Sequence, residues 1–323
     1  MPPAPIPVLA SVAARPVLEP LVADLAAQNA ITLSWFATLD EALMLAADAE
    51  VAWLEPSPLD QRHQIATAAT GLKWLSSMAA GLETLPLALL RQRGVIVTNG
   101  NGLNSPTVAD YAVMGVLSLA KGLPDVVRAH DRREWLTVSP GTAELEGSRA
   151  LVIGYGTIGQ SIARRLRAFD VEVTGVRRTA DPAQNVLGPE DWRSRLGEYD
   201  WIVIAAPATD ATHHLIGAAE LAAMKPTAGI VNIARGQLID QSALIAALRE
   251  GRIAGAFLDV TDPEPLPPDD PLWTAPNCTV TMHLSGRSQT SMLRRAAERF
   301  AANLRRYAAS EPLDYVADLR LGY

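Results

Sequence analysis

The sequence predicts an α/β protein with two doubly wound parallel-sheet domains. Short apolar runs alternate with segments whose apolar residues recur at helical spacing, beginning near the start of the chain. This alternation favours parallel strands, because a helix between two strands returns the chain to the same end of the sheet. A glycine-rich turn near the middle of the chain separates two such sets of runs, which indicates two domains.

The predicted elements follow from the positions of the apolar runs. The first set of strands is expected at residues 6–10, 31–35, 51–54, 74–77 and 95–98. The second set is expected at residues 149–153, 171–176, 201–205, 229–233, 254–259 and 279–282. A helix at 105–130, opened by Ser105-Pro106-Thr107, is expected between the domains, and a helix at 288–307 is expected to cross back to the first domain.

Composition limits the possible functions. The chain has 323 residues, of which 49% are hydrophobic, so it can bury large cores, and its net charge is -7. The absence of a basic block argues against nucleic acid and anionic membranes as partners, and no window is apolar enough to span a bilayer. Cys278 is the single cysteine, which excludes an intrachain disulfide and a cysteine-rich metal site, and no metal is predicted. The start of the chain lacks a basic leader, so we expect a cytoplasmic protein.

The glycine-rich turn has the context of a dinucleotide-binding site. The run Gly154-Tyr155-Gly156-Thr157-Ile158-Gly159 follows a predicted strand and opens a helical pattern. In such a turn the first glycine permits the sharp bend, the second lets the backbone approach a pyrophosphate, and the third lets the helix pack on the strand. The amino terminus of the helix then faces the phosphates. Tyr155, Gly156, Thr157 and Ile158 are therefore the predicted cofactor-binding residues of this turn.

The end of the next predicted strand carries Arg177 and Arg178. A site for NAD would be expected to have a carboxylate here, which accepts hydrogen bonds from the ribose 2′-hydroxyl. A guanidinium instead pairs with a 2′-phosphate through charge-assisted hydrogen bonds. The pair predicts a preference for NADP(H), with NAD possible. The alternative is that both arginines are merely solvated charges after a strand.

Three further strand ends carry side chains suited to acid–base chemistry. Arg235, Glu264 and His283 follow three successive predicted strands, and Asp259 ends the second of them. Ligands of open parallel sheets gather beyond the carboxyl ends of the strands, so these groups are expected on one rim. Arg235 can bind a carboxylate or polarise a ketone, while His283 can give or take a proton. Glu264 can orient the imidazole and favour its protonated form, which reduction of a ketone requires.

The chain resembles the D-isomer-specific 2-hydroxyacid dehydrogenases through nearly its whole length. The motifs that carry the resemblance are Ala80-Gly81-Leu82-Glu83, Gly94 to Asn99, Gly154 to Gly159, Val231 to Asp240, Gly255 to Pro267 and His283 to Gly286. This superfamily includes glyoxylate/hydroxypyruvate reductases, phosphoglycerate dehydrogenase and formate dehydrogenase. Formate dehydrogenases carry glutamine at the position of Glu264, so that branch is disfavoured. Many relatives have a proline just before the histidine, where this chain has Met282.

The resemblance implies roles for individual residues. Arg235, Glu264 and His283 are the implied catalytic residues, Ala79, Ala80 and Gly81 offer backbone amides to the substrate carboxylate, and Arg235 and His283 also contact the substrate. Ala206, Pro207, Ile233 and Asp259 are further implied cofactor contacts. Asp259 could instead simply cap a strand end.

The resemblance also implies the domain roles and the reaction. A flavodoxin-like substrate domain is expected at residues 1–103 plus 291–323, and a Rossmann dinucleotide-binding domain at 104–290. NADPH would reduce a 2-oxoacid, such as glyoxylate, hydroxypyruvate or a larger analogue, to the D-2-hydroxyacid, with His283 as proton donor. A homodimer is expected. The alternative function is a dinucleotide-sensing interaction protein of the corepressor type, which the fold alone does not exclude.

Overall fold

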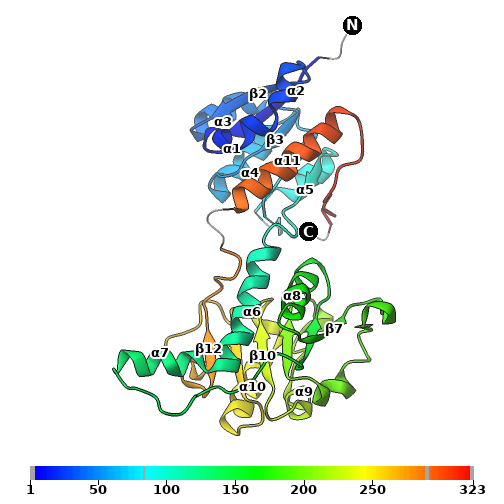
Figure 1. The fold of residues 1–323 in the computed structure, drawn as a ribbon. Helices are drawn as coiled ribbons and strands as arrows, with labels where there is room; N and C mark the ends of the chain where they lie inside the picture. The colour runs from blue at the N-terminus through cyan, green and yellow to red at the C-terminus, as the bar shows by residue number, and fades with distance from the viewer. Residues whose placement is uncertain (1–3, 80, 83, 288–290, 321–323) are drawn as a thin grey trace. The chain divides into compact units, whose positions relative to one another are not determined.

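The chain divides into two compact units, each built around its own parallel sheet. The computed structural model describes residues 4–79, 81, 82, 84–287 and 291–320. The first unit comprises Met1–Asn104 with Ser288–Tyr323, and the second comprises Ser105–Arg287 (Figure 1). Their sheets have five and seven strands, and every strand pairing within them is parallel. The predicted fold class is confirmed.

The first unit has a flavodoxin-like strand order, β2-β1-β3-β4-β5. Its strands are β1 (Ile6–Ser11), β2 (Ile31–Phe36), β3 (Val51–Trp53), β4 (Trp74–Ser76) and β5 (Ile96–Thr98). Its helices are α1 (Arg15–Leu21), α2 (Ala23–Ala27), α3 (Leu39–Ala46), α4 (Leu59–Ala68), α5 (Leu87–Gln92) and α11 (Met292–Ala308).

Alternating residues of the first sheet are buried on opposite faces, as the period of a strand requires. Leu9, Ala52 and Leu75 pack in one core cluster with residues of α3, α4 and α5. Val8 and Trp53 pack in the other with residues of α1 and α11, and Figure 1 shows these two helices together. The last long helix thus completes the first unit, although it follows the whole second unit in the sequence.

The second unit has the strand order β12-β11-β10-β9-β6-β7-β8, the Rossmann arrangement with one further strand. Its strands are β6 (Arg149–Ile153), β7 (Glu172–Val176), β8 (Val186–Leu187), β9 (Trp201–Ile204), β10 (Gly229–Asn232), β11 (Gly255–Leu258) and β12 (Cys278–Val280). Its helices are α6 (Ser105–Lys121), α7 (Leu123–Asp131), α8 (Thr157–Arg167), α9 (Ala218–Ala223) and α10 (Gln241–Arg249).

The faces of the second sheet are covered in the same alternating way. Val152 and Val203 pack with residues of α6 and α8, whereas Ile153 and Ile204 pack with residues of α9 and α10. Because both faces are covered, most strand residues are apolar, and the polar residues of the candidate site lie at the carboxyl ends of the strands or in the loops after them.

Two elements differ from the sequence-based prediction. The helix expected at 105–130 is interrupted at Gly122, whose φ of 59° is left-handed, so α6 and α7 are separate helices. The edge strand β8 was not predicted, because two residues are too few to produce a detectable apolar run. Within the described ranges, no helix has both the length and the apolar composition needed to cross a membrane.

Candidate active site

The glycine-rich turn lies where the strand order of the second sheet reverses. β6 pairs with β7 on one side and with β9 on the other, so the carboxyl ends of β6 and β9 are adjacent. Gly154 follows β6 with a φ of 98°, and a Cβ there would lie 2.3 Å from the amide nitrogen of Ala206. Only glycine permits this approach between the two strand ends. Ligands of doubly wound sheets bind at this reversal point.

The amino terminus of α8 provides the space and the donors for a pyrophosphate. Gly156 is the N-cap residue and makes no side-chain cap hydrogen bond, so the first amides of the helix have no such cap. A Cβ on Gly156 would meet nothing within 4 Å. Thr157 is exposed and Ile158 is half-buried. These features fit a dinucleotide.

Tyr155 lies differently from its neighbours in the turn. Its side chain is buried, and its amide donates to the carbonyl of Val176 at 2.8 Å. Its hydroxyl accepts a hydrogen bond from Nη2 of Arg167 at 3.1 Å. The phenol ring therefore supports the turn from within the unit, and its amide is already used.

Arg177 follows β7 and is held within its own loop. Its Nε donates to the carbonyl of Thr179 at 2.9 Å, and its Nη2 donates to Oδ2 of Asp181 at 3.2 Å. Arg178 is exposed and has no hydrogen-bond or ion-pair partner among the residues that the structure describes. Arg177 thus already has a carboxylate partner, while Arg178 has none.

The turn after β10 presents Arg235 at the surface. Asn232, which is buried, shapes this turn: its Oδ1 accepts from the amide of Ala234 at 3.0 Å and its Nδ2 donates to the carbonyl of Arg235 at 2.9 Å. The guanidinium of Arg235 donates to the carbonyl of Ala234 at 2.7 Å and is exposed. Its remaining donors are available to an anionic ligand.

A close backbone approach joins this turn to the loop after β11. A Cβ on Gly236 would lie 2.0 Å from the carbonyl carbon of Thr261, so only glycine fits. The amide of Thr261 in turn donates to Oε1 of Glu264 at 3.1 Å. The loops that carry Arg235 and Glu264 are therefore in direct contact.

Glu264 and His283 form a hydrogen-bonded pair. The distance between Nδ1 of His283 and Oε2 of Glu264 is 2.7 Å. The His283 side chain is 44% exposed and the Glu264 side chain 37%, so the pair is accessible to a ligand. With Nδ1 donating to the carboxylate, Nε2 is the ring nitrogen that remains for a substrate.

Asp259 organises the loop that carries His283. Its side chain is buried, and it accepts hydrogen bonds from the Thr281 hydroxyl at 2.8 Å, the Leu284 amide at 2.8 Å and the Ser285 amide at 3.1 Å. Its carbonyl also accepts from the amide of His283. Both carboxylate oxygens are thus used to hold the segment around the histidine.

The backbone around His283 has an unusual conformation. Met282 and His283 both have a φ of 56°, in the left-handed region that residues with a Cβ rarely adopt. Proline has φ fixed near about -65°, so it cannot take the conformation of Met282. The histidine loop therefore follows a path that is closed to a chain with proline at this position.

The loop after β4 in the first unit carries the predicted substrate amides. The amide of Ala79 donates to Oγ of Ser77 at 3.1 Å, so it is already engaged. Gly81 is half-buried, and its amide has no acceptor among the described residues. Ala80 lies outside the described residues.

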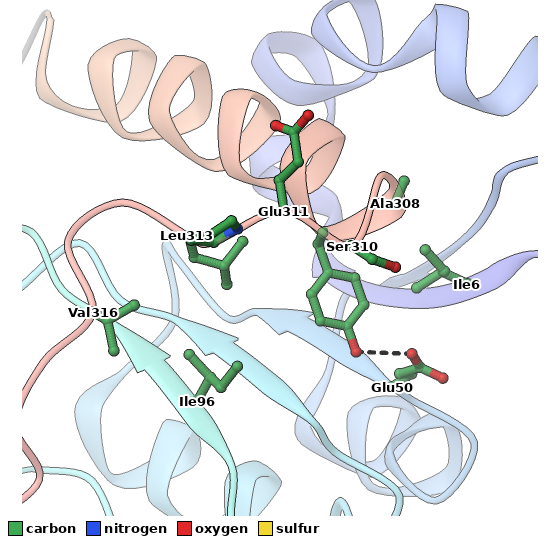
Figure 2. A pocket seen from close by; sticks show the side chains of 10 residues that line it. Ile6, Glu50, Ile96, Ala308, Ser310, Glu311, Leu313 and Val316 are labelled. Carbon is green, nitrogen blue, oxygen red and sulfur yellow. Dashed lines mark hydrogen bonds between the residues drawn. The ribbon is translucent and has the colours of Figure 1, made fainter.

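A separate hollow of about 660 Å³ lies at the opposite end of the same sheet (Figure 2). It is lined by residues at the amino ends of strands, such as Ile6 and Ile96, and by the segment after α11. The hydroxyl of Tyr307 donates to Oε1 of Glu50 at 2.8 Å, and burial raises the pKa of this phenol. The predicted substrate loop follows the carboxyl end of β4, at the other end of the sheet, so this hollow is not part of the predicted substrate site.

Sequence reasoning missed the residues that shape these loops. Asn232, Thr261 and Ser77 act through hydrogen bonds to residues two or three positions away. A polar residue near the end of an apolar run was the available signal for Asn232 and Ser77. Ser77 closes the predicted strand 74–77, and Asn232 is the last residue but one of the predicted strand 229–233.

The fold and the candidate site are matched by known proteins. Residues 113–285 match the family model described as D-isomer specific 2-hydroxyacid dehydrogenase, NAD binding domain. Glyoxylate reductase of Korarchaeum cryptofilum is 33% identical over 256 residues, covering 76% of each chain. Human glyoxylate reductase/hydroxypyruvate reductase is 35% identical over 253 residues, covering 74% of this chain and 76% of the relative.

Similarity extends over the whole fold in a solved structure. A D-isomer specific 2-hydroxyacid dehydrogenase from Xanthobacter autotrophicus, in complex with NADPH and MES, superposes with a TM-score of 0.72. The two are 28% identical, and the match covers 99% of this chain and 100% of the other.

The reversal point, the open helix terminus and the histidine–carboxylate pair define a dehydrogenase that uses a nicotinamide dinucleotide. The chain belongs to the D-isomer-specific 2-hydroxyacid dehydrogenase family and is similar to its glyoxylate/hydroxypyruvate reductases.

Proposed function

We propose that the protein is an NADPH-preferring reductase that converts a 2-oxoacid into the D-2-hydroxyacid. Glyoxylate, hydroxypyruvate or a somewhat larger analogue is the expected substrate, in agreement with the names of the relatives. The observation that carries the proposal is the 2.7 Å contact between His283 and Glu264, beside a loop that presents an exposed arginine.

The side chains have complementary tasks in this reaction. Arg235 binds the substrate carboxylate or polarises the carbonyl, since its guanidinium is exposed and has donors to spare. His283 donates a proton from Nε2 to the carbonyl oxygen, while Glu264 holds Nδ1 and stabilises the imidazolium. The bound cofactor supplies the hydride. The backbone amides of Ala79, Ala80 and Gly81 are the proposed contacts for the carboxylate from the first unit. Because the amide of Ala79 donates to Oγ of Ser77, the amide of Gly81 is the described donor left for the ligand.

The proposed cofactor contacts surround the reversal point of the second sheet. Gly156, Thr157 and Ile158 would hold the pyrophosphate at the start of α8. Ala206, Pro207, Ile233 and Asp259 lie after the carboxyl ends of β9, β10 and β11. Asp259 already uses both carboxylate oxygens within its loop, so a nicotinamide contact there would share an oxygen with those donors.

NADPH preference rests on the two arginines after β7. The 2′-phosphate would compete with Asp181 for Arg177, because that carboxylate occupies the guanidinium at 3.2 Å. The phosphate carries more charge and more acceptor oxygens than the carboxylate. Arg178 is exposed and can contribute a second fork of donors.

A homodimer formed through the second unit is also proposed. A groove of about 600 Å³ lies between α6 and the end of α8 and is lined largely by apolar side chains. Exposed apolar residues continue along α7, including Leu123, Val126 and Val127. Exposed apolar surface of this kind is typical of a protein interface.

The test of the proposed function is a panel of 2-oxoacids offered to the purified protein. Glyoxylate, hydroxypyruvate and larger 2-oxoacids would each be tested with NADPH and NADH, following the loss of absorbance of the reduced cofactor. We expect turnover with at least one acid and a higher kcat/KM for NADPH. Absence of turnover throughout the panel would contradict the reductase, and favour the corepressor-type alternative if dinucleotide binding persisted.

Variants of the loop after β7 test the cofactor preference. Arg177→Ala should lower kcat/KM for NADPH about 10- to 100-fold, the value of hydrogen bonds to a charged group, and leave NADH nearly unchanged. Asp181→Asn should favour NADPH by up to about fivefold, since it removes a competing, partly exposed partner.

Arg193→Ala is the matched control, because Arg193 also pairs with a carboxylate on the surface of the same unit, at Glu220. It should change neither cofactor. An equal effect of Arg177→Ala on both cofactors would remove Arg177 as the reader of the 2′-phosphate.

A further inference from the structure

Glu55 is a buried carboxylate at the carboxyl end of β3 in the first unit. It is 1% exposed. Its Oε1 accepts hydrogen bonds from Nη1 of Arg62 at 3.1 Å, the hydroxyl of Ser77 at 3.2 Å and the amide of Met78 at 2.9 Å. Two of these three donors belong to the loop after β4, which carries the proposed substrate amides. Glu55 therefore ties two neighbouring strand ends together.

Burying this carboxylate is costly. Its Oε2 has no hydrogen-bond partner among the described residues. Burial raises the pKa of Glu55, and the charge of Arg62 only partly opposes this shift. A buried ion pair is often no more stabilising than apolar side chains of similar volume. Stability alone is thus a weak reason for a glutamate here.

A relay of hydrogen bonds extends from Glu55 along the loop. The hydroxyl of Ser77 donates a hydrogen bond to Glu55, and its Oγ accepts one from the amide of Ala79 at 3.1 Å. The carbonyl of Ala79 accepts from the amide of Gly100 at 2.7 Å. The amides of Met78 and Ala79 and the carbonyl of Ala79 are therefore all held by hydrogen bonds. Both amides point into the unit, and the next described amide, that of Gly81, is the first with no acceptor among the described residues.

Arg62 completes the arrangement from α4. Its side chain is 13% exposed, and its Nε donates to the carbonyl of Ser57 at 2.7 Å. This second contact holds the guanidinium in place beside Glu55. The arginine also offsets the negative charge of Glu55, which would otherwise repel an anionic substrate at the adjacent loop.

We propose that Glu55, acting through Ser77, is a positioning residue: it holds residues 77–79 and thereby orients the loop after β4 that is proposed to receive the substrate carboxylate. This inference rests on the proposed function. It assigns to Glu55 no contact with substrate or cofactor. By holding the amides of Met78 and Ala79, it fixes the path of the loop and leaves the amide of Gly81, which has no described acceptor, for a carboxylate; this selects substrates that carry one.

Two conservative variants test this role without removing the bulk of the side chain. Glu55→Gln retains an acceptor but loses the charge, and Ser77→Ala breaks the relay to Ala79. Thr98→Val is the matched control: it removes a buried hydrogen bond, from Nε1 of Trp74 at 3.0 Å, in the same sheet but outside the loop. Thermal unfolding of all three variants reports any general loss of stability.

The first readout is independent of catalysis. Amide hydrogen exchange of the segment 77–82 should accelerate in Ser77→Ala and in Glu55→Gln, but not in Thr98→Val. Unchanged exchange in both loop variants would overturn the proposal, because the relay would then not hold the loop.

The second readout compares glyoxylate with methyl glyoxylate, in which the carboxylate is masked. The ratio of kcat/KM values, acid over ester, should fall about tenfold in Ser77→Ala and Glu55→Gln through a raised KM for the acid. The ratio should stay constant in Thr98→Val. A merely structural role would lower kcat/KM equally for the acid and the ester. An unchanged ratio in the loop variants would therefore overturn the positioning role.

The unmodified protein separates this inference from the function on which it rests. Suppose that the unmodified protein reduces glyoxylate but that Ser77→Ala and Glu55→Gln leave the acid-over-ester ratio of kcat/KM unchanged. The positioning role of Glu55 is then wrong, while the proposed function stands. If the unmodified protein reduces no 2-oxoacid, the proposed function fails and the positioning role falls with it.

Discussion

The chemistry of His283 depends on which of its ring nitrogens is free. Glu264 lies 2.7 Å from Nδ1, and its second oxygen accepts from the amide of Thr261 at 3.1 Å. The carboxylate is therefore anchored before it orients the imidazole. If His283 is the proposed general acid, a pair held in this way needs little reorganisation when Nε2 gives up its proton, which favours such catalysis.

Substitution of the histidine should separate catalysis from cofactor binding. We expect His283→Ala to lower kcat for the preferred 2-oxoacid about 10²- to 10⁴-fold, because the proposed proton donor is lost. The Kd for NADPH, measured by fluorescence titration, should change little. His130→Ala, an exposed histidine on α7 of the same unit, should leave both quantities unchanged. Retained turnover in His283→Ala would remove this residue from the mechanism.

The polar residues at strand ends were the part of the site most accessible to sequence reasoning. Arg235, Glu264 and His283 were expected on one rim, and the contact between Glu264 and His283 agrees with that expectation. Glu55 was not predicted as part of the site, because nothing in the local sequence indicates that its partners are Ser77 and Met78, more than twenty residues away. Contacts of this kind arise from the order of strands in the sheet, which periodicity does not encode.

The loop after β12 has two consecutive residues with an uncommon backbone conformation. Its two consecutive residues at φ of 56° are held by the hydrogen bonds from the following amides to Asp259. Residues in this region are stabilised only when their surroundings determine them. The apolar run before the loop predicted the strand, but the left-handed path depends on tertiary contacts of Asp259 and was not predictable.

Introducing the proline of many relatives should disturb this loop. Met282→Pro forces φ toward about -65° and moves the following His283 away from Glu264, so kcat should fall roughly tenfold or more. The Kd for NADPH should be unaffected. Met282→Ala, which keeps the backbone unrestricted, is the control. Full activity of Met282→Pro would contradict the left-handed conformation at residue 282. It would mean that the active protein has the backbone conformation of the relatives with proline.

The helical region after residue 104 shows the limit of periodicity for predicting breaks. The apolar spacing continues through Gly122, yet the chain turns there and begins a second helix. A glycine inside a helical pattern is compatible with either outcome. The consequence is that α7 presents its own exposed apolar side chains, rather than extending the buried stripe of α6.

At the scale of the whole molecule, the two parallel sheets followed from the alternation of apolar runs and helical patterns, whereas the assembly does not. Exposed apolar side chains on α7 and near the end of α8 motivate the proposed dimer. Val127→Asp should then shift the protein toward the monomer in sedimentation velocity, since it places a charge on that surface.

The control for the assembly is Met44→Asp, an exposed apolar residue of α3 in the first unit. It should leave the sedimentation coefficient unchanged. An unmodified protein that sediments as a monomer at micromolar concentration would refute the proposed dimer.

The single cysteine of the chain can report local opening of the β12 edge of the second sheet. Cys278 begins β12, the edge strand that leads to the histidine loop, and burial raises its pKa to about 12. A half-buried thiol that stays protonated reacts slowly with alkylating reagents, so faster labelling reports opening of that edge of the sheet. Slower labelling in the presence of a dinucleotide would reveal how far ligand binding steadies the strand before the histidine, without any engineered probe.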